Sequence, residues 1–438
     1  MATNLINLNA AGIDISSREH VVAVPEDRAK ESVRTFQGFT RNLHELSKWL
    51  KQCNVETIAM ESTGVYWYDL YTILLDYGFE VYLVNAYHVK NVPGRKSDVS
   101  DARWLQELHT FGLLRSSFQP DNLTRSLRNY VRQRKNIIRQ MTKETQRMQK
   151  ALEMMNIKLN LVIRDLTGKT GTAIITKILE GERDAKVLSQ YRDARIKASR
   201  ETLIKSLEGN WRSEQIFNLQ IAYEHYHFLQ KQLDKCDSES KKVIIKMAKS
   251  TNQKKQVTKI RKSKNNPKFN VSQYLYDALG VEITKVYGLK QITALTVFSE
   301  TGLNLKEKFP TEKQFLSWLN VVPNNKITGG KVISSKVKRK KNKAGQAFRE
   351  AASALWKAQN PIGDYLRRKK AKSGGRKAVV STARKIAAIY YKMVTEKVEF
   401  NPDHLIKNKE EYLLKKLKQL EKDKKRTERL LIDYQSVM

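Results

Sequence analysis

The chain has 438 residues, of which 40% are hydrophobic, and 82 Lys and Arg against 45 Asp and Glu give a formal net charge of +37. This hydrophobic content supports folded cores and excludes a disordered basic tail protein. The charge predicts a polyanionic partner, either a nucleic acid or an anionic membrane surface. The membrane is the weaker interpretation, because no stretch approaches the roughly 18 consecutive apolar residues of a membrane span.

The charge is unevenly distributed along the chain. Residues 1–120 carry a net charge of −2, whereas residues 121–438 carry +39. A near-neutral head is therefore joined to a strongly basic body.

Cys53 and Cys236 give no disulfide framework, and the seven His show no zinc-ligand spacing. These features predict a protein of a reducing cytoplasm without structural zinc.

Residues 1–122 alternate between strand and helix patterns. Apolar residues at a spacing of three to four predict helices at 42–52 and 67–78. Short runs rich in β-branched residues predict strands at 10–16, 20–24, 56–62 and 79–85. This order of elements predicts an α/β domain with a mixed sheet.

Residues 123–264 show the pattern of a coiled-coil arm. Apolar residues recur at heptad spacing along a first helix, at Val131, Ile138, Met141, Thr145, Met148, Leu152, Met155 and Leu159. A second such stretch runs through Leu219, Tyr223, Tyr226, Leu229, Leu233 and Cys236 toward Val243. Glycines interrupt the helical pieces between them, so we expect an antiparallel arm with an inserted helical tip.

Helical patterns return after an Asn-Asn-Pro linker that ends at residue 267. Residues 265–400 are expected to form a mainly α C-terminal domain. Residues 401–438 are expected to form a charged helical tail with a leucine seam at Leu413, Leu417 and Leu420.

Four carboxylates stand out in the near-neutral head: Asp14, Glu61, Asp98 and Asp101. Asp14 and Glu61 close predicted strands, and Asp98 and Asp101 are three residues apart, which places them on one face if a helix begins near Asp98. Carboxylates gathered in this way hold two Mg²⁺ ions in enzymes that displace phosphodiesters. The alternative is that Asp14 and Glu61 are ordinary acids at strand ends and that Asp98 is a helix N-cap.

Several long segments resemble one known family. They are GIDIS (12–16), AMESTGVYWYDLY (59–71), VNAYHVKNVPGRKSDVSDARWLQELHTFGLL (84–114) and FLSWLNVVPNNKITGGKVISSKVKRKKNKAGQAFREAASAL (315–355). In sequence and order they resemble the DEDD transposases, insertion-sequence recombinases that are guided by a bridge RNA and related to the Piv invertases.

The resemblance implies a RuvC-like, RNase H-type fold for the N-terminal domain, with Asp14, Glu61, Asp98 and Asp101 as the catalytic acids that hold Mg²⁺. It also implies that a hydroxyl nucleophile in the C-terminal transposase domain forms a covalent ester with DNA, and that a structured guide RNA selects target and donor DNA. The arm would mediate contacts in a homo-oligomer, a dimer or a tetramer, whose active site is shared between subunits. The location implied is the prokaryotic cytoplasm, at the nucleoid and not at a membrane.

The nucleophile departs from the family pattern, which places a serine before two glycines in a proline-led loop. Here the loop spans residues 323–331, and the matching residue is Thr328. A threonine hydroxyl can attack phosphorus, although its methyl group restricts χ1 and crowds the approach. Ser334 and Ser335 are the alternative nucleophiles. Lys331 would compensate phosphate charge.

Two runs of cations are candidate nucleic-acid contacts, beside the alternative that they form a solvated surface. They comprise Lys331, Lys336, Lys338, Arg339, Lys340, Lys341 and Lys343, followed by Arg367, Arg368, Lys369 and Lys370. Three functions stay open. The first is a recombinase with a covalent intermediate. The second is a catalytically impaired nucleic-acid-binding descendant, and the third is a RuvC-like nuclease in which metals activate water.

Overall fold

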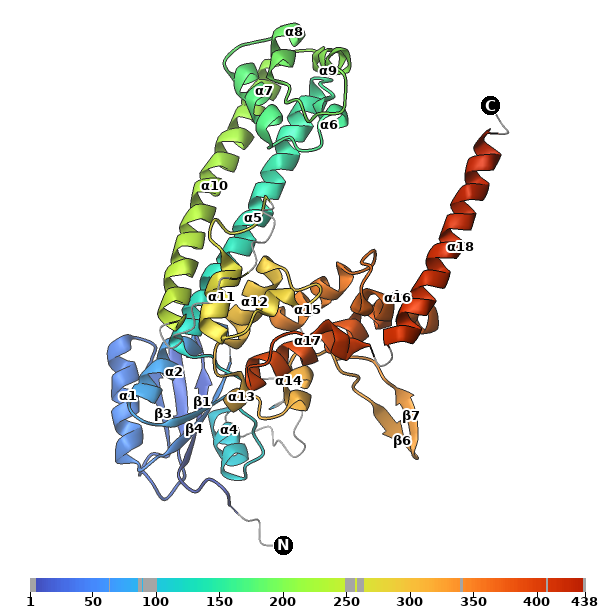
Figure 1. The fold of residues 1–438 in the computed structure, drawn as a ribbon. Coiled ribbons are helices and arrows are strands. Elements are labelled where there is room, and N and C mark those ends of the chain that lie inside the picture. The colour runs from blue at the N-terminus through green and yellow to red at the C-terminus, as the bar shows by residue number, and fades with distance from the viewer. Residues whose placement is uncertain are drawn as a thin grey trace. The chain divides into compact units, whose positions relative to one another are not determined.

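The computed structural model describes residues 5–62, 64–85, 89, 101–248, 257, 264–338, 342–406 and 409–435. The chain divides into two compact units, Met1–Gln119 and Pro120–Met438. Figure 1 shows the strands of the larger sheet in the first unit and the long helices in the second. The expected mixed α/β N-terminal region and mostly helical remainder are confirmed. The expected boundaries at 122, 264 and 400 stay predictions.

The first unit is built on a mixed sheet of five strands in the order β3-β2-β1-β4-β5. The β1–β2 and β2–β3 pairs are antiparallel, and β1–β4 and β4–β5 are parallel. The strands are β1 (Ala10–Ile15), β2 (Glu19–Ala23), β3 (Val33–Gln37), β4 (Thr57–Glu61) and β5 (Glu80–Val84), and the helices are α1 (Thr40–Gln52), α2 (Trp67–Asp76) and α4 (Asp101–Thr110). β3 is not among the predicted strands, because only Phe36 of its five residues is buried and it lacks an apolar pattern.

Alternate residues of β4 enter two different hydrophobic cores, as the two-residue period of a strand requires. Ile13 and Met60 join the core that α1 and α2 form with one face of the sheet. Ala59 joins the smaller core on the other face, with Trp104 and Leu105 of α4. Helices therefore cover both faces, and α4 covers the face opposite to α1 and α2.

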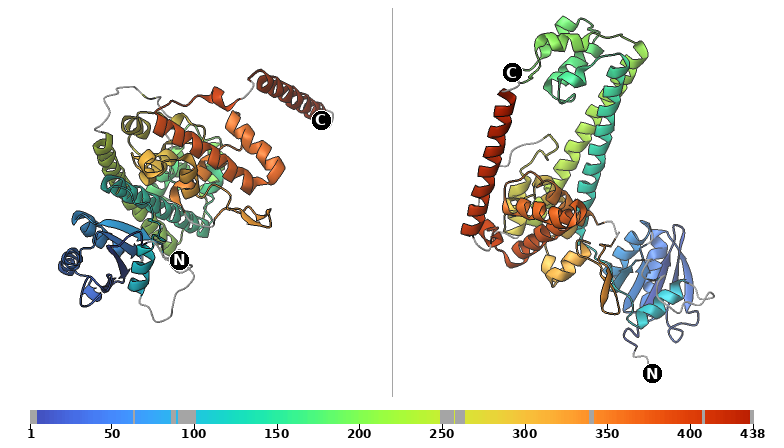
Figure 2. Two further views of the ribbon diagram at one scale, coloured as in Figure 1. Left: turned by 90° about the horizontal axis from the view of Figure 1, so that it is seen from below. Right: turned by 90° about the vertical axis from the view of Figure 1, so that its right-hand side faces the viewer.

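The second unit begins with the expected antiparallel arm, which Figures 1 and 2 show as two long helices with a cluster of short helices at the far end. The arm helices are α5 (Asn122–Met154) and α10 (Ser213–Met247), and the tip contains α6 (Leu159–Val162), α7 (Lys169–Leu179), α8 (Ala185–Leu188), η1 (Ser189–Tyr191) and α9 (Arg200–Leu207). One continuous hydrophobic core runs along the arm into the tip.

The seam of the arm is less apolar than the sequence suggested. Val131, Met141, Met148 and Leu152 are buried as expected, but Ile138 is only partly buried and Thr145 is not among the buried residues of α5. The structure instead buries Arg134, Ile137 and Glu144, and on α10 it buries Asp237. Polar residues therefore occupy inward-facing positions of the heptad. Arg134 pairs with Asp237 across the arm, and Glu144 pairs with the exposed Arg147 along α5.

The C-terminal part of this unit is mainly helical, with one small β-hairpin. Its elements are α11 (Val271–Leu279), η3 (Ile283–Lys285), α12 (Gln291–Thr301), α13 (Leu305–Lys308), α14 (Glu312–Trp318), β6 (Lys326–Thr328), β7 (Lys331–Ser334), α15 (Lys343–Ser353), α16 (Pro361–Ser373), α17 (Gly375–Glu396), η4 (Pro402–Leu405) and α18 (Lys409–Gln435). Leu413, Leu417 and Leu420 of the expected seam on α18 are exposed. In the described parts of the chain, no helix is long and apolar enough to cross a membrane.

Buried ion pairs connect the arm to these helices. Glu300, near the end of α12, has only 6% of its side chain exposed. Its carboxylate forms an ion pair with Arg128, whose Nε lies 3.0 Å from Oε2, and accepts two hydrogen bonds from Arg132, each at 2.9 Å. Because Arg128 and Arg132 lie on α5, the base of the arm and α12 form one packed body.

Candidate functional site

Asp14 and Glu61 lie at the same level on neighbouring parallel strands. The last registered pair between β1 and β4 is Ile13 with Met60, and the two acids are the next residues of each strand. Paired residues of parallel strands point to the same face, and this face is opposite to that of Ile13 and Met60. Both carboxylates therefore project to the face that α4 covers, and both are half-buried.

Gly12 determines how closely α4 approaches these acids. A Cβ atom at position 12 would collide with the backbone carbonyl oxygen of Ala102 and the backbone nitrogen of Gln106. Only glycine allows this approach. Asp101 immediately precedes Ala102 and begins α4, and Asp14 lies two residues, about 7 Å, further along β1 than Gly12. The packing of α4 on β1 thus brings Asp101 to the sheet face that carries Asp14 and Glu61.

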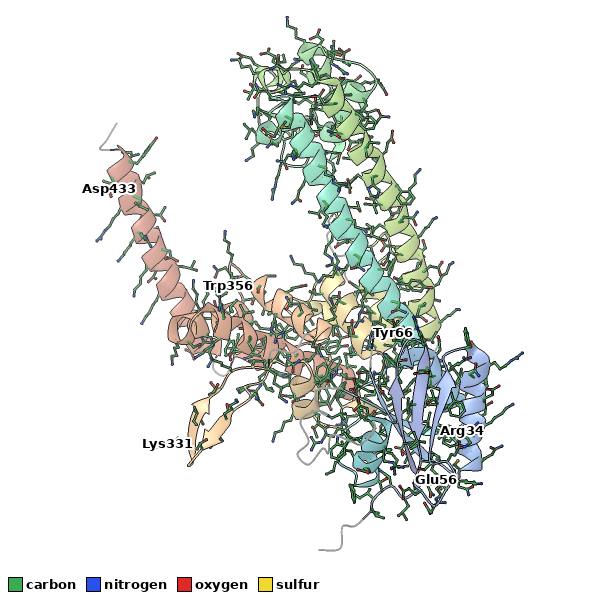
Figure 3. The ribbon with its side chains drawn as sticks, turned by 180° about the vertical axis from the view of Figure 1, so that it is seen from behind. Arg34, Glu56, Tyr66, Lys331, Trp356 and Asp433 are labelled. Carbon is green, nitrogen blue, oxygen red and sulfur yellow. The ribbon has the colours of Figure 1, made fainter. Side chains whose placement is uncertain are left out.

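The fourth expected acid, Asp98, lies outside the described residues. Within the described ranges, no group of three or more His, Cys, Asp and Glu side chains is close enough to hold a metal ion. Asp14 and Glu61 nevertheless fit a hard divalent cation, since two carboxylates on one face at one level supply the oxygen ligands that Mg²⁺ prefers. Tyr66, five residues after Glu61 in the sequence and labelled in Figure 3, has an exposed aromatic ring.

The segment expected to be a nucleophile loop is a two-stranded hairpin. Thr328 pairs with Lys331, and Gly329 and Gly330 form the turn between them with φ values of 54° and 73°. Two positive φ values are typical of the type I′ turn, which suits the twist of a hairpin and favours glycine at both positions. Thr328 is therefore exposed beside the turn, and Figure 3 shows Lys331 at the end of the hairpin.

The alternative nucleophiles lie at the other end of β7. The Ser334 hydroxyl accepts a bond from the Lys336 amide at 3.4 Å, and the Lys336 carbonyl accepts one from the Asn324 amide at 3.1 Å. Ser335 is exposed. The hairpin thus presents Thr328 at its tip and the two serines near its base.

The candidate nucleic-acid contacts have different environments. Arg339, Lys340 and Lys341 lie outside the described residues. The described Lys331, Lys336, Lys338, Lys343, Arg368 and Lys370 are exposed, and Lys369 is half-buried. Arg367 is engaged within the fold, where its guanidinium donates to the carbonyls of Trp356 at 3.0 Å and Ala358 at 2.9 Å and pairs with Asp364.

The structure adds two residues to this basic region, Tyr365 and Lys385, which are not among the predicted contacts. The Lys385 ammonium lies 5.0 Å from the centroid of the Tyr365 ring. Their signal in the sequence is their near-equal distance from Gly374 and Gly375, because two antiparallel helices joined by a tight turn place such residues side by side.

Two family models match the chain, and together they span more than half of it. The model of the IS110-type DEDD transposases matches residues 11–157, and that of the IS116/IS110/IS902 transposase family matches residues 282–367. No curated protein matches the chain. The first segment includes all four acids and the second includes Thr328, in the order that the sequence resemblance implied. The chain therefore belongs to the IS110-type transposases, a family of enzymes that recombine DNA.

Proposed function

We propose that this transposase cuts and rejoins DNA by phosphoryl transfer through a covalent ester between Thr328 and DNA. One observation carries the proposal: Asp14 and Glu61 lie side by side on the sheet face that α4 covers, and α4 begins with Asp101. The first unit would then have the RuvC-like version of the RNase H fold. Its five-stranded mixed sheet supports this assignment.

In this proposal Asp14, Glu61 and Asp101, with Asp98, hold Mg²⁺, as a pair of ions. When bound, the ions would supply positive charge to the reacting phosphodiester. The carboxylates themselves position these charges, and their placement on strand ends and on a helix start keeps that arrangement rigid.

Thr328 supplies the nucleophile. Its Oγ–phosphorus bond forms while a phosphorus–oxygen bond to deoxyribose breaks, the hydroxyl proton leaves to a base, and the departing oxygen takes up a proton. Gly329 and Gly330 have no side chains, and apart from the adjacent residues no atom of the described chain lies within 4 Å of where their Cβ atoms would be. The backbone at the turn can therefore approach a phosphate closely, with the Lys331 ammonium beside it.

The threonine itself favours a second candidate function. Its β-methyl restricts the side chain and crowds an in-line approach, so the chain could bind nucleic acid with impaired catalysis. A third candidate is a RuvC-like nuclease in which the metal ions activate water and Thr328 takes no part. The covalent adduct separates these three functions.

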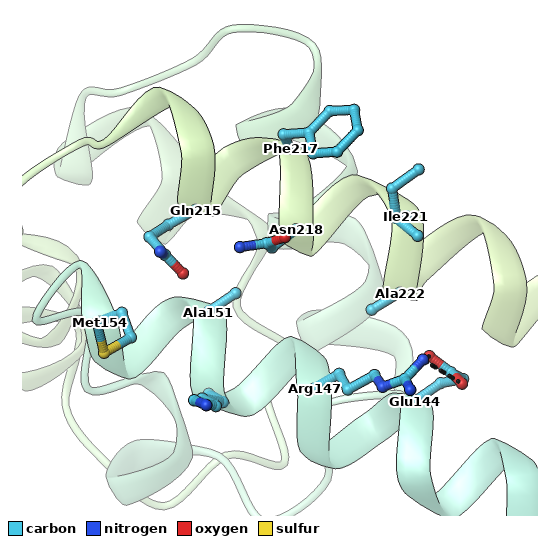
Figure 4. Close-up of a pocket in the computed structure, with 10 residues that line it drawn as sticks. Glu144, Arg147, Ala151, Met154, Gln215, Phe217, Asn218, Ile221 and Ala222 are labelled. Atoms are coloured by element: carbon cyan, nitrogen blue, oxygen red, sulfur yellow. Dashed lines mark hydrogen bonds and ion pairs between the residues drawn. The ribbon is translucent and has the colours of Figure 1, made fainter.

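The partners in this proposal are target and donor DNA, a structured guide RNA and further copies of the chain, in the cytoplasm. The net charge of +39 over residues 121–438 supports two nucleic-acid partners. A groove near the tip of the arm supports a homo-oligomer, because it contains the exposed apolar side chains of Phe217, Ile221 and Met154. Figure 4 shows these residues above the ion pair of Arg147 and Glu144.

The test is to incubate the protein with Mg²⁺, guide RNA and target DNA, digest it, and locate the nucleotide-linked peptide by mass spectrometry. We expect the adduct on Thr328, its loss in Thr328→Val and its retention in Thr328→Ser. An adduct on Ser334 or Ser335 would move the nucleophile to that residue. Cleavage without any adduct would identify the nuclease, and binding without cleavage the impaired descendant.

A second variant tests the carboxylates. Asp14→Ala should abolish cleavage and leave RNA binding nearly unchanged, because Asp14 lies on the sheet of the near-neutral unit. Full recombination by this variant would remove the metal-binding role from Asp14.

A further inference from the structure

Helices α16 and α17 place several cations around one tyrosine. Gly374, with φ 78°, joins the two helices, and Tyr365 of α16 lies beside Lys385 of α17. The Lys385 ammonium is 5.0 Å and the Lys369 ammonium 5.8 Å from the centroid of the Tyr365 ring. Both distances are within the range of cation–π attraction, so the one ring attracts both ammonium groups.

In the described ranges, no carboxylate forms an ion pair with Arg368, Lys369 or Lys385. Burial and the neighbouring Arg368 charge both lower the pKa of Lys385, which is half-buried. The aromatic ring attracts the ammonium groups but does not neutralise them. The fold therefore keeps like charges together, and an external anion would relieve their repulsion.

Neighbouring cations in the same run have other partners. Arg367 is held by the carbonyls of Trp356 and Ala358 and by Asp364, and the Lys370 ammonium lies 5.5 Å from the centroid of the Trp356 ring. Figure 3 shows Trp356 close to this helix pair. Arg367 is thus engaged within the fold, and Lys370 meets a different ring from Lys369 and Lys385.

We propose that Arg368, Lys369 and Lys385 form a binding site for the phosphodiester backbone of a nucleic acid, with Tyr365 positioning the two lysines. The site deepens the proposed function, on which it rests, and it lies just beyond the segment that the family model matches. DNA and RNA share the chemistry that these cations recognise, since ammonium and guanidinium groups bind phosphate oxygens irrespective of base sequence.

The test measures the binding of the full-length protein to a short DNA duplex and to an RNA hairpin by fluorescence anisotropy at several salt concentrations. A phosphate contact contributes about 0.9 to the slope of log K against log salt for duplex DNA. We therefore expect Lys385→Gln to reduce this slope by about one and to weaken binding at low salt. Lys385→Arg should retain both.

Lys392→Gln is the matched control. Lys392 lies on α17 two turns after Lys385, and its ammonium already pairs with Glu396 at 3.9 Å. Its loss should leave the slope unchanged. If Lys385→Gln behaves like Lys392→Gln with both nucleic acids, the site is refuted. An effect with only one of them supports the site and identifies its ligand as DNA or RNA.

Acetylation of the wild-type protein gives a second measurement that does not depend on how a variant folds. Bound nucleic acid should protect Lys385 from an acetylating reagent and leave Lys392 reactive. Equal reactivity of Lys385 with and without nucleic acid, under conditions in which the protein is saturated, would overturn the proposal. If the wild-type protein binds neither nucleic acid, the proposed function fails as well, so the two failures are distinguishable.

Discussion

Replacing Asp237 by asparagine should destabilise the base of the arm by about 3–5 kcal/mol. The side chains of Asp237 and Arg134 are 5% and 4% exposed, and Arg134 Nε donates to Asp237 Oδ1 at 2.6 Å. The asparagine amide would keep the shape of the carboxylate but not its charge. The Arg134 guanidinium would then be buried with neutral acceptors only, including the Asn265 carbonyl at 2.8 Å. The loss also affects the chain after the arm, because Asp237 Oδ2 accepts a bond from the Lys268 amide at 3.2 Å.

Hydrogen exchange followed by mass spectrometry is the suitable assay, since it reports the opening of the arm base separately from the other unit. Peptides from the regions of Arg134 and Asp237 should exchange faster in Asp237→Asn. Glu239→Gln is the control on the same helix: Glu239 pairs with Lys242 at 2.6 Å, but the two side chains are 42% and 66% exposed. Its cost should be about 0–1 kcal/mol.

Equal exchange rates in Asp237→Asn and Glu239→Gln would show that the buried pair does not stabilise the base of the arm. The double variant Arg134→Met, Asp237→Leu provides a further check. It removes both charges and keeps apolar volume in the seam, so it should recover most of the stability that Asp237→Asn loses.

Three further predictions concern other parts of the chain. Gly12→Ala should displace α4 from β1, lower the free energy of unfolding of the first unit by about 1–3 kcal/mol in urea titrations, and reduce DNA cleavage. Burial lowers the pKa of His109 to about 4 from its usual 6.5. The folded state therefore binds fewer protons than the unfolded state, and the first unit should lose stability as the pH falls from 6.5 to 4, by up to about 1.4 kcal/mol per pH unit. His109→Gln should reduce this pH dependence in urea titrations at several pH values. A smaller pH dependence should remain, because burial also lowers the pKa of His20. Arg367→Met should lower the melting temperature through the lost bonds to Trp356 and Ala358, at a cost of about 1–3 kcal/mol, with little change in the salt dependence of DNA binding.

The architecture of the first unit was predictable from local patterns. Alternation in residues 10–16 and 56–62 indicated buried strands, and an acid at the end of each was the signal for Asp14 and Glu61. The pairing of β1 with β4, which places these acids side by side, requires the tertiary structure. So does the role of Gly12, because nothing in the sequence indicates that a helix about 90 residues later packs on that position.

The register of the arm was only partly predictable, for a physical reason. A heptad pattern identifies a seam by its apolar residues, and an arginine or an aspartate is therefore assigned to the surface. Arg134 and Asp237 occupy the seam because each is the partner of the other. Such a pair is visible only when both helices are aligned, since the two residues are 103 positions apart in the chain.

Net charge likewise overstates the number of cations that can bind nucleic acid. The +39 of residues 121–438 counts every cation equally, but Arg128, Arg132, Arg134 and Arg367 bind carboxylates or carbonyls within the fold. Lys397 likewise donates to the Leu279 carbonyl at 2.9 Å. Adjacent residues of one basic run, Arg367 and Arg368, thus serve different purposes. Because only cations that meet phosphate release counter-ions, the salt dependence of binding should follow the exposed cations without acidic partners and fall well below the net charge.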